Sequence, residues 1–307
     1  MINVFDIYRK GLSEIWENKS LLFWLYGFNL LFAYLLALPV SMMFGEALDQ
    51  TVAAEKLLAA FDLTLLASII SKYGAGISLN RLILTFGLLY FLLNIFFTGG
   101  IISHFARAEK FNFRKFITGC TDYIGRFFRL FLISFLFLLG VLILFVLFSK
   151  LFGWITEGAA TEHSSVILFA IRLIIIGILL AMINMLFDYA KIITVVNNHT
   201  KMFRTVKSAL GFVFSHSGRT ILLFSLFLLT ALIIMSFYYL IESVIHVNSG
   251  LMIMLFFLWS QIYVLAKLWI RLSFFAGQYL FYDKAMIRNL PEPVELLEAE
   301  IWEDSIE

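Results

Sequence analysis

Charged residues are scarce in this chain, at 14% of its 307 residues, whereas hydrophobic residues make up 62%. A soluble domain is about 25% charged and about 45–50% apolar. So many apolar side chains cannot be hidden inside a water-soluble globule, because a folded chain of this size still exposes much of its surface. The composition therefore predicts a protein whose solvent is the lipid bilayer.

Proline and cysteine are also rare. Three prolines in the whole chain favour long uninterrupted helices, since proline inside a helix removes a backbone donor and clashes with the preceding turn. The single cysteine, Cys120, excludes an internal disulfide, and its phenylalanine-rich surroundings predict a small apolar packing residue. A net charge of +2 without a dense basic run argues against a nucleic-acid partner.

Catalytic signatures are missing too. The sequence holds no Ser/His/Asp arrangement, no HExxH motif and no glycine-rich phosphate loop. Its five histidines are too scattered to make a metal site. We therefore expect no enzymatic activity, no cofactor and no metal.

The chain does contain six long apolar segments, each near the length of about 20 residues that crosses the hydrocarbon core. They are Leu21–Phe44, Leu82–Phe105, Leu130–Phe152, Val166–Phe187, Ile221–Ile241 and Leu251–Ile270. We predict an all-α fold, a polytopic transmembrane helix bundle of about six spans that forms one domain over residues 1–283. The connection 45–81 is expected to form two short external helices, and residues 284–307 an acidic cytoplasmic tail.

Lysine and arginine gather in alternate connections, which predicts the orientation because cytoplasmic loops carry an excess of both. Bases occur before the first span, between the second and third, between the fourth and fifth, and after the sixth. The long connection between the first and second spans also holds three bases, but beside four acids: Lys56, Lys72 and Arg81 against Glu46, Asp49, Glu55 and Asp62. The connection between the third and fourth spans has only Lys150 at its edge, and the one between the fifth and sixth has none. We expect both termini in the cytoplasm and the spans in the cytoplasmic (inner) membrane of a bacterial cell.

Each odd-numbered span follows an amphipathic segment with apolar residues at helical spacing. These segments contain Ile7 and Ile15, then Phe116, Tyr123 and Phe127, then Val206 and Val213. We expect helices in the headgroup layer whose apolar faces meet acyl chains. The even-numbered spans also match, since Asn94–Ile102 aligns without gaps with Asn184–Ile192, and Leu272–Leu280 keeps the phenylalanine and small residues. The pattern favours three copies of one unit, an interfacial helix followed by two spans.

The three-unit plan and two stretches of sequence resemble a group of uncharacterised six-span bacterial membrane proteins. The stretches are GGIISHFARAEKFNFRKFITGCTDYIGRFFRLFLIS and AAFDLTLLASIISKYG. More distantly, the plan is similar to the membrane domain found beside some glycerophosphodiester phosphodiesterases. The resemblance implies a six-span fold over nearly the whole chain. It implies no phosphodiesterase activity, because no counterpart of the soluble catalytic domain is recognisable in these residues.

Polar side chains within spans are costly and are therefore candidates for function. The candidate intramembrane contacts are Asn94, Asn184, Asp188, Lys191, Lys267 and Arg271. Asn184, Asp188 and Lys191 share one face of the fourth span. Asp188 is expected to meet Arg271, either as a structural ion pair or as part of a gate or headgroup site. The two asparagines are expected to link helices through hydrogen bonds.

Three functions remain open on these residues. The first is a non-enzymatic protein that organises membrane lipids, or that binds a protein partner or a second copy of itself. The second is a transporter or permease-type subunit for a lipid or small solute, although the spans lack the Gly and Pro interruptions typical of transporter sites. The third, an intramembrane enzyme, needs converging acid, base or nucleophile groups.

Reporter fusions test the predicted orientation. Reporters placed after Lys110, after His199 and at the C-terminus should all report the cytoplasm, and one after His163 the opposite side, because basic connections stay inside. A C-terminal reporter found outside would overturn both the span count and the orientation.

Overall fold

The computed structural model describes residues 3–49, 79–156, 162–245 and 250–288, and within these ranges it contains helices and no strand. The helices are α1 (Val4–Glu17), α2 (Lys19–Asp49), α5 (Leu79–Arg107), α6 (Phe113–Thr156), α7 (Glu162–Val196), α8 (Met202–Ser215), α9 (Ser217–Val244) and α10 (Gly250–Arg288). The predicted all-α fold is confirmed.

Six of the described helices, α2, α5, α6, α7, α9 and α10, are long and apolar enough to cross a membrane. Each of them contains one predicted span in full. Large apolar side chains cover their outer surfaces, and Ile143, Ile174 and Leu251 are 59%, 62% and 68% exposed. An apolar surface of this extent marks contact with a membrane. The chain is therefore a multi-pass membrane protein.

The predicted external connection and tail fall mostly outside the described residues. α2 continues to Asp49 and α5 begins at Leu79, so only the two ends of connection 45–81 are described, and both are helical. The predicted short external helices lie outside the described residues. α10 extends to Arg288, so residues 284–288 continue the last span as a helix.

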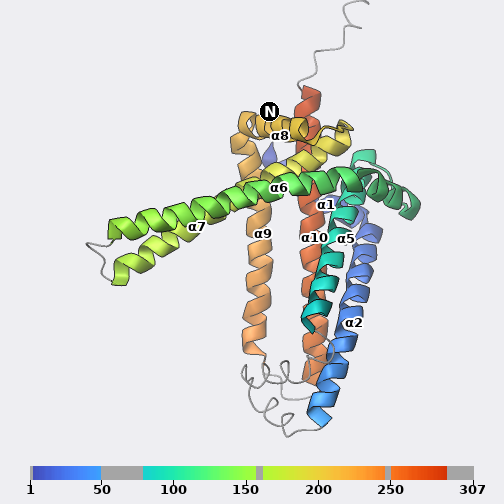
Figure 1. Cartoon of the computed structure of the whole chain (residues 1–307). Coiled ribbons are helices and arrows are strands. Elements are labelled where there is room, and N and C mark those ends of the chain that lie inside the picture. The colour runs from blue at the N-terminus through green and yellow to red at the C-terminus, as the bar shows by residue number, and fades with distance from the viewer. Residues whose placement is uncertain (1–2, 50–78, 157–161, 246–249, 289–307) are drawn as a thin grey trace, which may run out of the picture.

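Breaks at single residues turn the chain from an amphipathic helix into a span. Asn18 follows α1 and His216 follows α8, and neither has helical backbone angles. The backbone N–H of each donates to the carbonyl four residues earlier, in Glu14 and Phe212 respectively. Both helices have 14 residues, so the two breaks occupy equivalent positions. α1 and α8 lie together at one end of the molecule, which we call the α1–α8 end (Figure 1).

The amphipathic segments pack against the return spans of neighbouring units. The start of α6 packs on α5, α8 packs on α7, and α1 packs on α10, so the first unit meets the last and the three units form a ring. The return spans α5, α7 and α10 also contact one another, at the centre of this ring.

This packing corrects the expectation that the apolar faces of the amphipathic segments meet acyl chains. Phe116 and Phe127 are only 2% and 3% exposed, and the Phe116 ring lies against Gly100 of α5. The helical spacing predicts a buried face correctly. It does not distinguish a protein neighbour from a lipid neighbour on that face, because both offer an apolar surface.

Small residues let these helices approach one another closely. A methyl group added to Gly11 of α1 would lie 3.0 Å from the Cα atom of Gly277 and from the carbonyl oxygen of Ser273, both on α10. Gly100 of α5 faces the Cys120 sulfur of α6 in the same way, and Cys120 is fully buried as predicted. Such contacts matter in a membrane, where van der Waals packing replaces the hydrophobic drive between helices.

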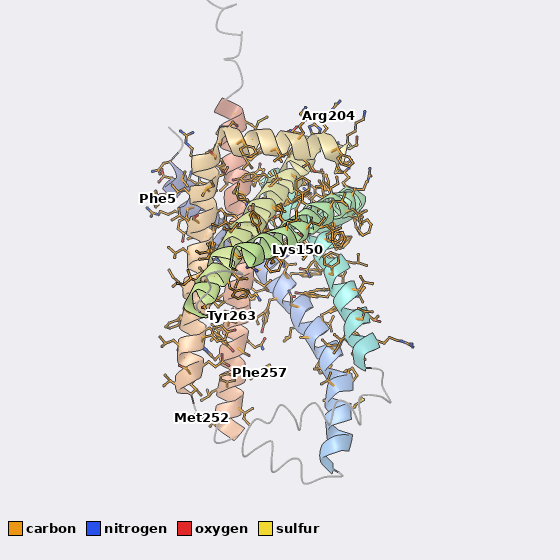
Figure 2. The ribbon with its side chains drawn as sticks, turned by 60° about the vertical axis from the view of Figure 1, so that its left-hand side comes forward. Phe5, Lys150, Arg204, Met252, Phe257 and Tyr263 are labelled. Atoms are coloured by element: carbon orange, nitrogen blue, oxygen red, sulfur yellow. The ribbon has the colours of Figure 1, made fainter. Side chains whose placement is uncertain are left out.

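The hairpin formed by α6 and α7 diverges from the other spans. In Figure 1, α2, α5, α9 and α10 run in roughly the same direction, whereas α6 and α7 leave them sideways, and in the turned view of Figure 2 α6 and α7 cross α9 and α10 obliquely. α6 is one continuous helix from Phe113 to Thr156, without the break found in the other two units. It therefore keeps the direction of its amphipathic start as it leaves α5.

We expect Gly11→Ala to lower the thermal stability of the purified protein, because the added methyl would meet backbone atoms of α10. Overpacking destabilises a protein by about 1–3 kcal/mol. Replacing a helical glycine by alanine stabilises it by about 0.5–1 kcal/mol, which is the smaller effect. Gly211→Ala on α8 is the control, because nothing lies within 4 Å of its added methyl and only the gain remains. Unfolding midpoints in detergent measure both effects. An equal gain in the two variants would show that α1 does not pack tightly on α10.

Candidate functional site

A cavity of about 310 Å³ lies between α5, α6, α7 and α10, in the angle where the hairpin separates from the central helices. We call it the hairpin cavity. Four of the six candidate polar residues line it, namely Asn94, Asn184, Lys191 and Arg271. Thr98 and Ser134 add two hydroxyl groups, and the rest of the lining is aromatic or aliphatic.

The end of the hairpin cavity toward the hairpin tip is apolar, and the opposite end, which we call its polar end, holds Lys191 among aromatic residues. On α7, Lys191 follows Leu180 by about three helical turns, and both line the cavity. On α6, Leu138 follows Phe127 by a similar distance. Because α6 leaves the α1–α8 end and α7 returns to it, Leu138 and Leu180 lie toward the hairpin tip and Lys191 lies toward the α1–α8 end.

Lys191 has an acidic partner. Its ammonium nitrogen lies 3.0 Å from the Asp188 carboxylate, one turn earlier on α7. The Asp188 side chain is 6% exposed and that of Lys191 is 28% exposed, so the carboxylate is buried while the ammonium group reaches the cavity. The ammonium also lies 6.0 Å from the centre of the Phe275 ring of α10. Asp188 therefore offsets the charge of Lys191.

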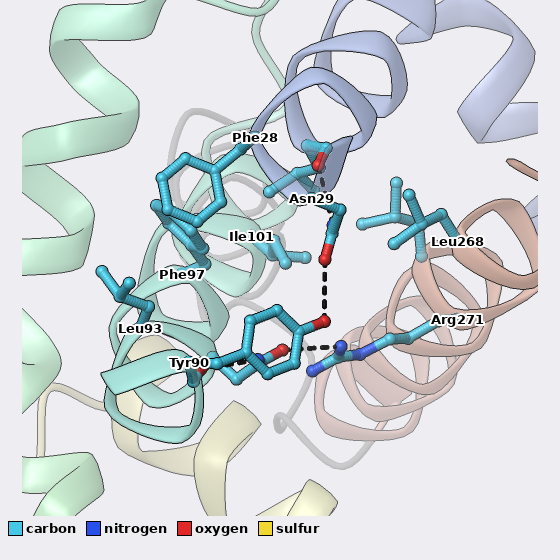
Figure 3. Close-up of a pocket in the computed structure, with 11 residues that line it drawn as sticks. Phe28, Asn29, Tyr90, Leu93, Phe97, Ile101, Leu268 and Arg271 are labelled. Atoms are coloured by element: carbon cyan, nitrogen blue, oxygen red, sulfur yellow. Dashed lines mark hydrogen bonds between the residues drawn. The ribbon is translucent and has the colours of Figure 1, made fainter. Parts of the chain in front are cut away.

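Arg271 has no acidic partner among the residues that the structure describes. One terminal nitrogen of its guanidinium donates a 2.9 Å hydrogen bond to the Asn94 side-chain oxygen, which joins α10 to α5 (Figure 3). Within the described part of the chain, the two ion pairs are Lys191 with Asp188 and Lys115 with Glu109. The positive charge of Arg271 is therefore not neutralised by any described side chain.

The predicted contact between Asp188 and Arg271 is not formed, since Asp188 pairs with Lys191 and Arg271 with Asn94. The polar residues of the fourth and sixth spans do come together, because Lys191 and Arg271 line one cavity. Asn94 forms an interhelical link, whereas the exposed Asn184 side chain has no hydrogen-bond partner among the described residues. Lys267 is exposed, one turn from Arg271, and is not part of the hairpin cavity lining.

A second cavity, of about 20 Å³, is lined by residues of α2, α5 and α10. The Tyr90 hydroxyl there donates to the Asn29 side-chain oxygen at 2.7 Å, and the Asn94 amide donates to the Tyr90 carbonyl at 2.8 Å (Figure 3). Such a volume suits about one water molecule. Asn94 and Arg271 line both cavities, so their hydrogen bond stands between them.

Asn29 and Tyr90 were not among the residues predicted for the site. Each is a polar side chain within an apolar span, which is the signal that identified Asn94. In the described residues, no group of three or more His, Cys, Asp or Glu side chains is arranged to hold a metal ion. The donors that do converge are cationic and amide groups, which bind anions.

Comparisons of the chain with protein-family models, with curated proteins and with solved structures found no match. The resemblance to six-span bacterial membrane proteins and to the phosphodiesterase membrane domain therefore stays a prediction. The hairpin cavity is the observation from which a function can be inferred.

A double-mutant cycle tests the observed pairing. Lys191→Gln strands a buried carboxylate, so Asp188→Asn and Lys191→Gln should each destabilise the protein, and the double variant should lose less than their sum. We expect a coupling of about 1–2 kcal/mol from unfolding midpoints in detergent. The same cycle with Asp188→Asn and Arg271→Gln should be additive. Coupling in the second cycle and none in the first would contradict the structure.

Proposed function

We propose that the protein is a non-enzymatic protein of the cytoplasmic membrane that binds and organises membrane lipid. The hairpin cavity carries this proposal. Its end toward the hairpin tip is apolar, at Leu138 and Leu180, whereas its other end holds Lys191 among aromatic residues, which matches the acyl chains and the headgroup of a lipid. The cavity also lies beside the diverging hairpin, where a lipid could enter sideways from the bilayer.

The predicted orientation agrees with this use of the cavity. Basic residues gather at the α1–α8 end, including Arg9 of α1, Arg107 at the end of α5 and Arg204 of α8. Figure 2 labels Arg204 at this end. If this end faces the cytoplasm, as the positive-inside rule predicts, the polar end of the cavity lies toward the cytoplasmic leaflet. A lipid of that leaflet then places its headgroup near Lys191 and its chains toward Leu138 and Leu180.

The amphipathic helices α1 and α8 support an organising role. Phe5 and Trp16 of α1 are 56% and 60% exposed, and Phe203 and Phe214 of α8 are 75% and 68% exposed. When the two helices are aligned from their first residues, Phe5 aligns with Phe203 and Trp16 aligns with Phe214. Exposed aromatic side chains beside basic residues are typical of a helix that rests in the headgroup layer. The protein thus contacts lipid at two matched positions outside the cavity.

Transport of a lipid or small solute is the second candidate function. The observation that favours it is the pair of cavities on either side of the Asn94–Arg271 hydrogen bond, because breaking that bond would join them. A transporter needs such a connection to open during its cycle. A lipid-organising protein does not.

Native mass spectrometry of the purified protein tests the proposed function by counting retained lipids. We expect Ser134→Trp to retain fewer lipids than the unchanged protein, because the indole fills the hairpin cavity. Leu142→Trp is the control on the same helix, since Leu142 is 57% exposed and does not line the cavity. Equal lipid retention in both variants would contradict the proposal. Lipid or solute flux in proteoliposomes that Ser134→Trp abolishes would favour the transporter instead.

A further inference from the structure

We infer that the hairpin cavity selects a lipid with an anionic, phosphate-bearing headgroup, and that Arg271 binds this headgroup by exchanging Asn94 for it. The inference rests on the proposed lipid-binding function and adds the chemical class of the ligand. It also assigns Arg271 as the residue that recognises the ligand.

The charges of the cavity call for an anion. Lys191 and Arg271 bring two positive charges to the lining, and only the charge of Lys191 is offset, by Asp188. A cation within a span is costly unless it is paired or reaches water or headgroups. A zwitterionic headgroup would leave the charge of the site in place. An anionic headgroup neutralises it.

The chemistry of Arg271 favours phosphate among anions. A guanidinium offers five N–H donors in a planar fork that fits two oxygens of a phosphate at once. Among the described residues, Arg271 donates from one nitrogen, to Asn94. The exposed Arg271 side chain therefore keeps donors for a ligand, while Lys191 and the unpartnered Asn184 amide line the same cavity.

Asn94 acts as a replaceable partner. Its amide oxygen is neutral and accepts one bond, whereas a phosphate carries negative charge and can accept two parallel bonds from one guanidinium. A phosphate oxygen therefore competes well for the guanidinium. The Asn94 amide nitrogen keeps its hydrogen bond to the Tyr90 carbonyl, which holds the side chain in place, and only its oxygen loses a partner when Arg271 turns to the ligand.

Lys267 provides a matched control for Arg271. It lies one turn earlier on α10, is exposed and has no acidic partner among the described residues, but it is not part of the hairpin cavity lining. Lys267→Gln removes one positive charge from the same helix. It leaves the cavity unchanged.

Titration of the purified full chain with phosphatidylglycerol or phosphatidylcholine, followed by native mass spectrometry, tests the inference. We expect tighter binding of phosphatidylglycerol, and Arg271→Gln should weaken it about tenfold, the effect of losing one charge-assisted hydrogen bond. Arg271→Lys should weaken phosphatidylglycerol binding less than Arg271→Gln, because lysine keeps the positive charge. It should still weaken binding, because lysine lacks the planar fork of donors. Asn94→Ala should strengthen it a few-fold, because no bond has to be exchanged. Lys267→Gln should change it little.

The remaining outcomes overturn the inference. Equal binding of the two lipids, or an equal loss in Lys267→Gln and Arg271→Gln, would show that the cavity does not select the headgroup through Arg271. A loss in Asn94→Ala as large as that in Arg271→Gln would exclude the exchange. Arg271-dependent binding of inorganic phosphate, without any preference between lipids, would replace the lipid by a soluble ion. Retention of no lipid at all by the unchanged protein would instead contradict the proposed function itself.

Discussion

The close approach of Gly11 on α1 to Gly277 on α10 determines where the last helix stands. Because neither residue has a side chain, the two backbones meet directly, and the first unit packs on the third. α10 is thereby held against both α5 and α7. Arg271 lies less than two turns before Gly277 on the same helix, so this contact also places the guanidinium beside Asn94 and the hairpin cavity.

The cavity itself depends on a difference between the units. Asn18 and His216 interrupt the helix in the first and third units, which lets α2 and α9 turn away from α1 and α8 and stand beside α10. The second unit has no such interruption, so α6 continues straight and carries α7 with it. A fully regular threefold ring would leave no such angle between the hairpin and the central helices. The departure from the repeat thus provides the space, and the matching asparagines of the first two units, Asn94 and Asn184, are among the polar residues that line it.

The sequence was sufficient to predict the helices, because six apolar segments of bilayer length leave the backbone no other way to satisfy its hydrogen bonds. It also identified most polar residues of the cavity, since a charge or amide within a span stands out. It did not predict which side chains pair. Asp188 meets Lys191 and not Arg271, and that choice depends on side-chain direction and helix rotation, which residue spacing leaves open. The sequence did not predict the divergence of α6, because it results from the lack of a helix break, and no residue signals that lack.

The ring has a consequence for the order in which the chain assembles. The contacts of α6 with α5 and of α8 with α7 join segments that are close in sequence, so they form soon after each segment is synthesised. Those of α1 with α9 and α10, including the hydrogen bond between the Tyr8 and Thr230 hydroxyls, join opposite ends of the chain. Contacts of such high sequence separation form slowly and late. We therefore expect the docking of the N-terminal helix to be a late step, because its partners α9 and α10 are synthesised last.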